Sequence, residues 1–243
     1  HQDILSFSKR LPYKIFVRLL YRNRQIVCVG KSIADEMTNV YGMDKKMIRV
    51  VQNPVDGRTI DRMRYEKNDF PYPYILFCGR LTAVKCPERV IRAFYKGGFY
   101  KNYSLVILGI GELEDKLKQM AEKYNVAEKV CFRGWEKNVY KWMDKADLLI
   151  LTSDSEGLSM VLLEALYCEC PVVAVRSRGP EQIMTGELER YLCGPSDDSV
   201  IGTMKAALSH YPDHLVRYTE NFSVDKNVKT YLEIYREWDE TVK

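Results

Sequence analysis

Short apolar segments alternate with longer amphipathic ones along most of the chain after residue 73. The apolar segments cover 74–78, 105–108, 130–132, 148–151 and 172–175, with a sixth candidate at 191–193. Apolar runs of this kind are typical of strands buried on both faces of a parallel sheet. Helix-length stretches lie between them at 87–95, 112–124, 138–145 and 159–168. The alternation predicts an α/β fold with a Rossmann-like, doubly wound parallel sheet.

The chain before residue 73 suggests a second, incomplete domain. Two more strands are predicted at 25–30 and 47–51, with a helix at 32–41 between them, and turn residues at 53–57 predict a linker. Because position 1 is His rather than Met, we expect an N-terminal portion to be missing. The predicted domains are therefore 1–55, the truncated end of an N-terminal domain, and 56–220, a complete domain. A final helix at 221–243 is expected to pack back toward the N-terminal part.

Charge is concentrated at the N-terminal end. The formal net charge is +4, yet residues 1–50 hold ten Lys or Arg against four Asp or Glu, so they carry +6 and the remainder −2. In residues 9–24 these cations alternate with aromatic and aliphatic side chains, a pattern that suits an anionic membrane surface or an anionic substrate. An ordinary helix with a solvated basic face explains the pattern equally well. The longest apolar runs fall far short of the roughly 18 residues that span a bilayer.

The number and spacing of the cysteines indicate a reducing compartment and argue against disulfides and zinc sites. The seven cysteines are an odd set in apolar surroundings, no pair is spaced Cys-x-x-Cys, and the chain has only three His. We expect buried free thiols in a reducing cytoplasm, without disulfides and without zinc.

The exits of the first two predicted strands carry cations and glycines. Ligands of open parallel sheets bind beyond the carboxyl ends of the strands. Arg80 and Lys85 stand just before a helix, a setting that suits a diphosphate, although both also fit an ordinary surface loop. Gly109 and Gly111 begin a dinucleotide fingerprint, but its third glycine would stand where Glu114 is, so the pattern fails. What remains is a tight turn with room for a ligand.

The exit of the fourth strand holds two acidic residues. Glu156 lies in the loop, and Glu164 is the only charged side chain in the apolar stretch 160–168. A buried charge is costly unless it is hydrogen-bonded or paired, and vicinal ribose hydroxyls are suitable donors. The alternative is that Glu164 occupies the one solvent-facing line of its helix.

Together these segments resemble the family-4 retaining glycosyltransferases of the GT-B fold, mainly their C-terminal nucleotide-sugar-binding domain. The Glu-x7-Glu motif formed by Glu156 and Glu164 is the most specific piece. The other matching pieces, in the family's order, are 27–32, 53–56, 77–81 with Lys85, 108–111, 132–134, 163–165, 171–174 and 179–181. One departure is 177–181, Ser-Arg-Gly-Pro-Glu, which keeps a single glycine where the family usually has two.

The resemblance implies roles for individual residues. Arg80 and Lys85 would hold the diphosphate and stabilise the charge that develops on it, and Glu156 would approach the donor sugar, so these three are the expected catalytic residues. Glu164 would bind the ribose. The expected remaining binding residues are Gly157, Leu158 and Ser159 near sugar and phosphate, Arg133 and Gly134 at the base, Gly109 and Gly111 at the glycine turn, and His1 facing the reacting sugar. No metal ion and no cofactor are expected, and the sequence has no Asp-x-Asp triplet.

The implied activity is transfer of a hexose or N-acetylhexosamine, with retention, from a UDP-sugar to a glycolipid or polysaccharide acceptor. Bacterial lipopolysaccharide, capsule or O-antigen synthesis is the expected setting, at the cytoplasmic face of the inner membrane, with peripheral membrane contact through the basic segment and no nucleic acid partner. A second hypothesis is a nucleotide-sugar-binding module that is inactive without the missing acceptor domain. A third, a nicotinamide-dependent oxidoreductase, is disfavoured by Glu114 and the scarcity of His.

Overall fold

The computed structural model describes residues 11–71 and 73–242, and these divide into two compact units. The larger unit is Val55–Ser223, and the smaller one consists of the described residues before Val55 and after Ser223. His1, for which a role facing the sugar is expected, lies outside the described residues, as do Lys9 and Arg10 of the basic segment.

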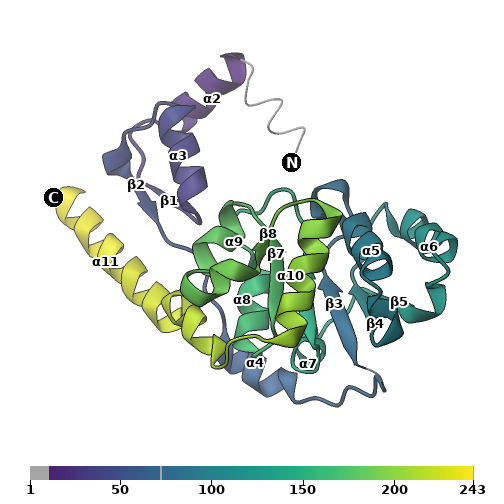
Figure 1. Cartoon of the computed structure of the whole chain (residues 1–243). Helices are drawn as coiled ribbons and strands as arrows, with labels where there is room; N and C mark the ends of the chain where they lie inside the picture. The colour runs from purple at the N-terminus through teal and green to yellow at the C-terminus, as the bar shows by residue number, and fades with distance from the viewer. Residues whose placement is uncertain (1–10, 72, 243) are drawn as a thin grey trace. The chain divides into compact units, whose positions relative to one another are not determined.

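The larger unit is built on a six-stranded parallel sheet (Figure 1). The strands are β3 (Tyr74–Cys78), β4 (Ser104–Leu108), β5 (Val130–Gly134), β6 (Leu148–Leu151), β7 (Val172–Val175) and β8 (Leu192–Cys193), in the order β5-β4-β3-β6-β7-β8. Numbered within this unit, the order is 3-2-1-4-5-6, the order of dinucleotide-binding α/β folds. Strands are added outward from β3 in one direction and then from β6 in the other, so the strand order reverses between β3 and β6 and the predicted doubly wound Rossmann-like fold is confirmed.

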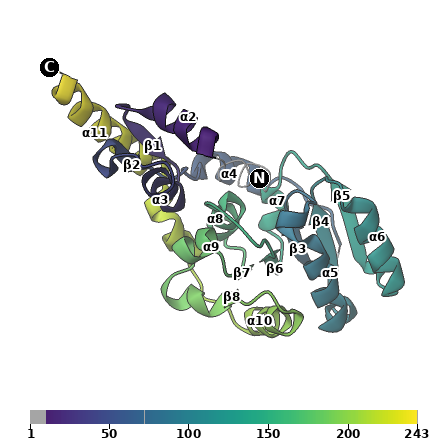
Figure 2. The ribbon, with the colours of Figure 1, turned by 90° about the horizontal axis from the view of Figure 1, so that it is seen from above.

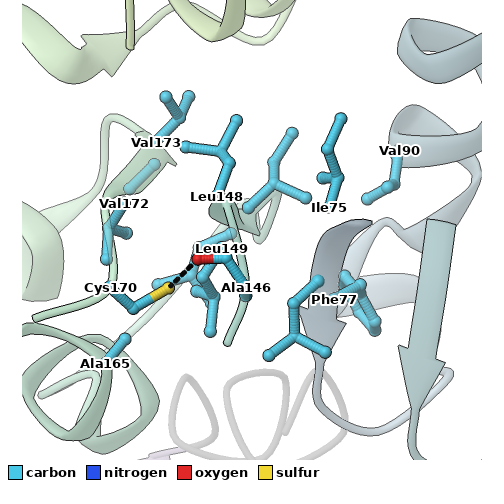
Figure 3. Close-up of a cluster of buried hydrophobic side chains, with 14 of the residues drawn as sticks. Ile75, Phe77, Val90, Ala146, Leu148, Leu149, Ala165, Cys170, Val172 and Val173 are labelled. Atoms are coloured by element: carbon cyan, nitrogen blue, oxygen red, sulfur yellow. Dashed lines mark hydrogen bonds between the residues drawn. The ribbon is translucent and has the colours of Figure 1, made fainter. Parts of the chain in front are cut away.

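Continuous apolar sequence buries the central strands on both faces. Ile75 pairs with Leu148, and both are fully buried (Figure 3). Phe77 on β3 and Val173 on β7 add to the same core. Burying each such side chain stabilises the fold by about 1.5–3 kcal/mol relative to leaving it in water. The Cys170 thiol, which lies in this core, donates a hydrogen bond of 3.8 Å to the carbonyl oxygen of Ala146.

Helices cover both faces of the sheet. Figure 2 shows α5 (Pro87–Lys96) and α10 (Asp197–Ser209) packed together on one face, with α4 (Gly57–Arg64), α7 (Tyr140–Met143) and α8 (Met160–Tyr167) on the other. Next to α5 lies α6 (Glu114–Lys123), and α9 (Arg178–Ile183) follows β7. Pro87 opens α5, where its missing N–H group costs nothing, and Val90, Ile91 and Phe94 point from one side of that helix into the core.

The segment 53–57 is only partly a linker. Val55 forms a parallel bridge with Ser223, and Asp56 caps α4 by accepting a hydrogen bond of 3.1 Å from the Thr59 N–H. Gly57, predicted to lie in the linker, is the first residue of α4, a helix that the sequence pattern did not predict. A Cβ atom at Gly57 would lie 2.3 Å from the Tyr167 hydroxyl oxygen, so α4 packs directly on α8 through this glycine.

The smaller unit contains two parallel strands, three α-helices and a short 3-10 helix at Lys45–Met47 within the described residues. The strands are β1 (Ile26–Cys28) and β2 (Ile48–Val50), and the helices are α2 (Leu11–Tyr21), α3 (Lys31–Asn39) and α11 (Val224–Val242). In α2, the side chains of Ile15, Phe16, Leu19 and Leu20 are exposed.

No helix among the described residues has both the length and the apolar character needed to cross a membrane. The described part of the chain also contains no group of three or more His, Cys, Asp or Glu that could hold a metal ion.

Candidate functional site

The loops that leave β3 and β6 meet beyond the carboxyl ends of these strands, at the switch point where the strand order reverses. Thr152, the first residue after β6, is fully buried, and its hydroxyl oxygen lies 2.9 Å and 3.0 Å from the carbonyl oxygens of Lys85 and Cys86. The Arg89 guanidinium donates to the Thr152 carbonyl oxygen at 2.6 Å. These contacts fix the backbone at Lys85 against the exit of β6, in the place where ligands of such sheets bind.

Lys85 and Glu156, two of the predicted catalytic residues, form an ion pair across these loops. The Lys85 ammonium lies 2.6 Å from Glu156 Oε1, and their side chains are 23% and 10% exposed. The Ser153 hydroxyl donates to the same oxygen at 2.6 Å, and Ser153 is itself buried. Charge-assisted bonds of this length are among the stronger interactions in proteins, so Glu156 is held from two sides.

Glu164 lies in different surroundings. It projects from α8, and within the described residues its carboxylate has no ion pair and accepts a long hydrogen bond of 3.4 Å from the Tyr140 hydroxyl. Burial raises the pKa of Glu164 to about 7, against the lowering effect of that hydrogen bond. Burial, together with the neighbouring Glu164 carboxylate, raises the pKa of Tyr140 to about 12. Glu164 is half-buried and shares one line of α8 with Met160, Val161 and Tyr167, which are half-buried too, so both interpretations of its role stay predictions.

Gly109 and Gly111, at the exit of β4, pack closely against the backbone of the loop that leaves β3. A Cβ atom at Gly109, where φ is +145°, would lie 1.9 Å from the Gly79 carbonyl oxygen, and one at Gly111 would lie 2.3 Å from that of Leu81. The Leu81 N–H donates to the Ile110 carbonyl oxygen at 3.0 Å. The two loops are therefore joined backbone to backbone, and close packing between loops accounts for both glycines without a ligand.

The loop 154–159 is closed on one side and open on the other. The Gly179 N–H donates to the Glu156 carbonyl oxygen at 3.0 Å, and a Cβ atom at Gly179 would lie 2.9 Å from the Gly157 carbonyl oxygen. The one glycine kept in 177–181 is thus needed for packing. A Cβ atom at Gly157 would meet nothing within 4 Å, Leu158 is half-buried, and Ser159, which precedes α8, is buried.

The remaining predicted residues are placed less closely together. Arg80 is exposed and forms no ion pair within the part of the chain that the structure describes. The Arg133 guanidinium lies 5.3 Å from the ring centre of Trp142, so this side chain packs on its own unit. Gly134 has a φ of +69° and its carbonyl oxygen accepts a hydrogen bond of 2.7 Å from the Gly109 N–H.

Sequence reasoning missed four residues at this site. Thr152, Ser153, Arg89 and Tyr140 supply the hydrogen bonds that hold Lys85, Glu156 and Glu164. Ser153 stands three positions before Glu156, a spacing that suits a local turn contact and was the one available signal. The partners of Thr152, Arg89 and Tyr140 lie 24 to 67 positions away, so only the fold reveals them.

A doubly wound sheet with charged loops at its switch point defines a class of ligand-binding α/β proteins, and comparison with known families narrows the class. Residues 61–223 match the family described as glycosyl transferases group 1. Because the match covers more than half of the chain, the chain belongs to this family.

Similar proteins act on bacterial glycans. The chain is 29% identical over 180 residues to the Campylobacter jejuni N-acetylgalactosamine-N,N'-diacetylbacillosaminyl-diphospho-undecaprenol 4-alpha-N-acetylgalactosaminyltransferase, with 74% of this chain and 49% of that protein covered. It is 30% identical over 183 residues to LpsE of Rhizobium meliloti, a lipopolysaccharide core biosynthesis glycosyltransferase, with 74% and 50% covered.

Solved structures show the same fold. HepE of Anabaena in complex with UDP superposes with a TM-score of 0.79 at 16% identity, covering 93% of this chain and 68% of that one. The apo form of the lipopolysaccharide outer core galactosyltransferase WaaB superposes with a TM-score of 0.71 at 21% identity, covering 94% and 65%. The expected GT-B fold is thereby confirmed. The chain spans about half the length of the first curated relatives that it matches, from 36% to 60%.

Proposed function

We propose that Val55–Ser223 is the donor-binding domain of a retaining glycosyltransferase that takes a hexose or N-acetylhexosamine from a UDP-sugar. Support for UDP comes from the solved structure of HepE, which holds that nucleotide and has a TM-score of 0.79 to this chain. The proposed acceptor is a glycolipid or polysaccharide of lipopolysaccharide, capsule or O-antigen synthesis, in keeping with what the relatives' names say of them.

The observation that carries this proposal is the meeting of Lys85, Glu156 and Ser153 at the switch point of the sheet. The backbone of Lys85 is anchored there by the Thr152 hydroxyl, and Arg80, in the same loop after β3, has no ion pair within the described residues. Two cations at a strand exit suit a diphosphate, and they would stabilise the negative charge that develops as the nucleotide leaves. No divalent ion is required for that role in the proposed mechanism.

Glu164 is proposed to bind the ribose. Glu164 is half-buried, and its carboxylate is short of hydrogen-bond donors, since the Tyr140 hydroxyl at 3.4 Å is a weak partner. Two vicinal hydroxyl groups would satisfy it and favour its ionised form. Glu156 is proposed to face the donor sugar, with the backbone of Gly157, Leu158 and Ser159 near sugar and phosphate, and the backbone at Arg133 and Gly134 near the base.

The smaller unit is proposed to belong to the acceptor side. Its helix α2 exposes Phe16 and Leu19 next to Arg18 and Arg22, a combination that suits the surface of an anionic membrane. We place the reaction at the cytoplasmic face of the inner membrane on this basis. The second candidate function is donor binding without transfer, because the proposed donor-site residues Lys85, Glu156 and Glu164 all lie within Val55–Ser223.

Calorimetric titration with UDP, GDP and ADP tests the donor site directly. We expect UDP to bind, and Glu164→Ala and Arg80→Ala each to weaken binding about tenfold, because each removes one charged hydrogen-bonding group. Arg62→Ala on α4 removes an exposed arginine from a different element and should bind UDP as the unchanged protein does. Failure of all three nucleotides to bind would refute the donor-domain proposal. Release of UDP from UDP-glucose or UDP-N-acetylglucosamine, measured with a lipid-extract acceptor, separates transfer from binding alone.

A further inference from the structure

Lys85, the cation proposed to hold the donor's diphosphate, is already occupied by a carboxylate. Its ammonium lies 2.6 Å from Glu156 Oε1, and only 10% of the Glu156 side chain is exposed. A diphosphate that approaches this site therefore meets a cation whose charge is balanced, next to a negative oxygen that repels it. The pair is an obstacle to the ligand as well as part of its site.

The position of Glu156 is itself fixed. The Ser153 hydroxyl donates to Glu156 Oε1 at 2.6 Å, and the Glu156 carbonyl oxygen accepts a bond of 3.0 Å from the Gly179 N–H. Ser153 is 3% exposed, so water does not compete effectively for this contact. The backbone of Lys85 is equally fixed by the Thr152 hydroxyl. Both ends of the ion pair are thus anchored, and only the lysine side chain has freedom to turn away.

Resting on the proposed function, we propose that Ser153 is a positioning residue of the donor site: through Glu156 it keeps the Lys85 ammonium engaged until the donor's phosphate groups displace the carboxylate. Release of Glu156 from Lys85 then leaves its carboxylate available to the donor sugar. Although Glu156 belongs to the proposed donor site, loss of its charge should therefore strengthen nucleotide binding rather than weaken it.

The first test needs no nucleotide. Reductive methylation of lysines, followed residue by residue with mass spectrometry, reports how accessible each free amine is. We expect Lys85 to react several-fold faster in Glu156→Gln than in the unchanged protein, and to a lesser extent in Ser153→Ala. Ser153→Thr keeps the hydroxyl and should restore the slow rate.

The matched control is Glu88→Gln. Glu88 lies three positions after Lys85 and forms its own pair with Lys116 at 3.0 Å, so the variant removes the same charge nearby without freeing Lys85. Lys116, and not Lys85, should react faster in this control. Thermal unfolding of each variant checks that the fold is retained.

The second test is UDP titration of the same variants. We expect Glu156→Gln to bind UDP about tenfold more tightly, equivalent to about 1.4 kcal/mol, and Glu88→Gln to bind it as the unchanged protein does. Lys85→Met should weaken UDP binding, and adding Glu156→Gln to it should give a smaller gain than in the unchanged protein, because only the repulsion by the carboxylate is then removed.

Each outcome decides between the two proposals. An unchanged Lys85 labelling rate in Glu156→Gln would overturn the inference while leaving the proposed function in place if UDP still binds. Faster labelling with equal or weaker UDP binding would show that the carboxylate does not compete with phosphate, which also overturns it. If the unchanged protein binds none of UDP, GDP and ADP, the proposed function fails, and with it the displacement step.

Discussion

Glu156 and Glu164 stand eight positions apart in the sequence, yet the protein treats their charges in opposite ways. Glu156 has a lysine ammonium and a serine hydroxyl, each at 2.6 Å. Glu164 has a tyrosine hydroxyl at 3.4 Å and no ion pair within the described residues, and burial raises its pKa to about 7. One carboxylate is compensated inside the protein, and the other is left uncompensated.

The difference suggests a division of labour. A compensated carboxylate contributes to the stability of the free protein and must be released before it can act on a ligand. An uncompensated carboxylate destabilises the free protein near neutral pH and gains when a ligand supplies donors. The two acidic residues of one motif would therefore respond in opposite directions to the same substitution.

The largest expected effect is a gain in stability from Glu164→Gln. The unfolded protein ionises this carboxyl near pH 4.5 and the folded protein near pH 7, so folding binds protons between these values and the free energy of unfolding falls as pH rises. The glutamine variant has no carboxyl group to ionise at this position, so its free energy of unfolding does not fall for this reason. Its advantage should be near zero at pH 4 and approach about 3 kcal/mol above pH 7. Urea unfolding at several pH values measures it, and an advantage that is constant with pH would contradict it.

Lys85→Met should act in the opposite direction, with a smaller magnitude. It leaves the Glu156 carboxylate with Ser153 alone in a largely buried position, which we expect to cost about 2 kcal/mol at pH 7. The double variant Lys85→Met/Glu156→Gln should recover most of this loss, since no charge is then left without a partner. Urea unfolding of the three variants tests the cycle, and equal costs for the single and double variants would show that the pair itself contributes nothing.

Thr152→Val tests the hydrogen bonds of the Thr152 hydroxyl, which hold the loops after β3 and β6 together. It removes the hydroxyl that contacts the Lys85 and Cys86 carbonyl oxygens and should cost about 1–2 kcal/mol, because these buried acceptors lose a donor. The control Thr152→Ser keeps the hydroxyl and should lose much less. Chemical unfolding measures the loss of stability, and the rate of Lys85 labelling reports whether the loop at Lys85 has loosened locally.

Tyr140→Phe should have the smallest effect. The Tyr140 hydroxyl donates to Glu164 and so lowers the pKa of that carboxyl. Removing the hydroxyl should raise this pKa by less than about one unit, so the free energy of unfolding should continue to fall up to a slightly higher pH. Stability at pH 5 should change little, since Glu164 is then neutral in the folded protein. Tyr95→Phe on α5 provides a control for loss of a tyrosine hydroxyl. An equal change of pH dependence in both variants would show that the Tyr140 hydroxyl has no specific effect on Glu164.

Much of the larger unit could be predicted from the sequence, because its strands are apolar runs bounded by turn residues. The runs 74–78, 148–151 and 172–175 coincide with β3, β6 and β7. Helix α4 was missed because its sequence is mostly polar and only Ile60 is buried. Its existence depends on the Asp56 cap and on close packing of Gly57 against Tyr167, which is a tertiary contact.

The residues of the candidate site were singled out by two sequence features, and their roles stay predictions. The motif spacing pointed to Glu156 and Glu164, and the strand exit pointed to Lys85. Their partners were not evident, because a hydroxyl such as that of Thr152 or Tyr140 acquires its role from residues brought near by the fold. The glycines 109 and 111 have a backbone packing role that a sequence pattern cannot distinguish from a ligand-binding one.

The contact between Thr152 and Lys85 also bears on how the protein folds. These residues are 67 positions apart, and the strands before them, β3 and β6, are neighbours in the sheet. Long-range contacts of this kind close large loops and form slowly compared with local helices. During synthesis, the first cationic loop leaves the ribosome well before the segment that anchors it. The proposed donor site therefore cannot exist in a nascent chain that ends before residue 152, however much of the first half of the sheet has already formed.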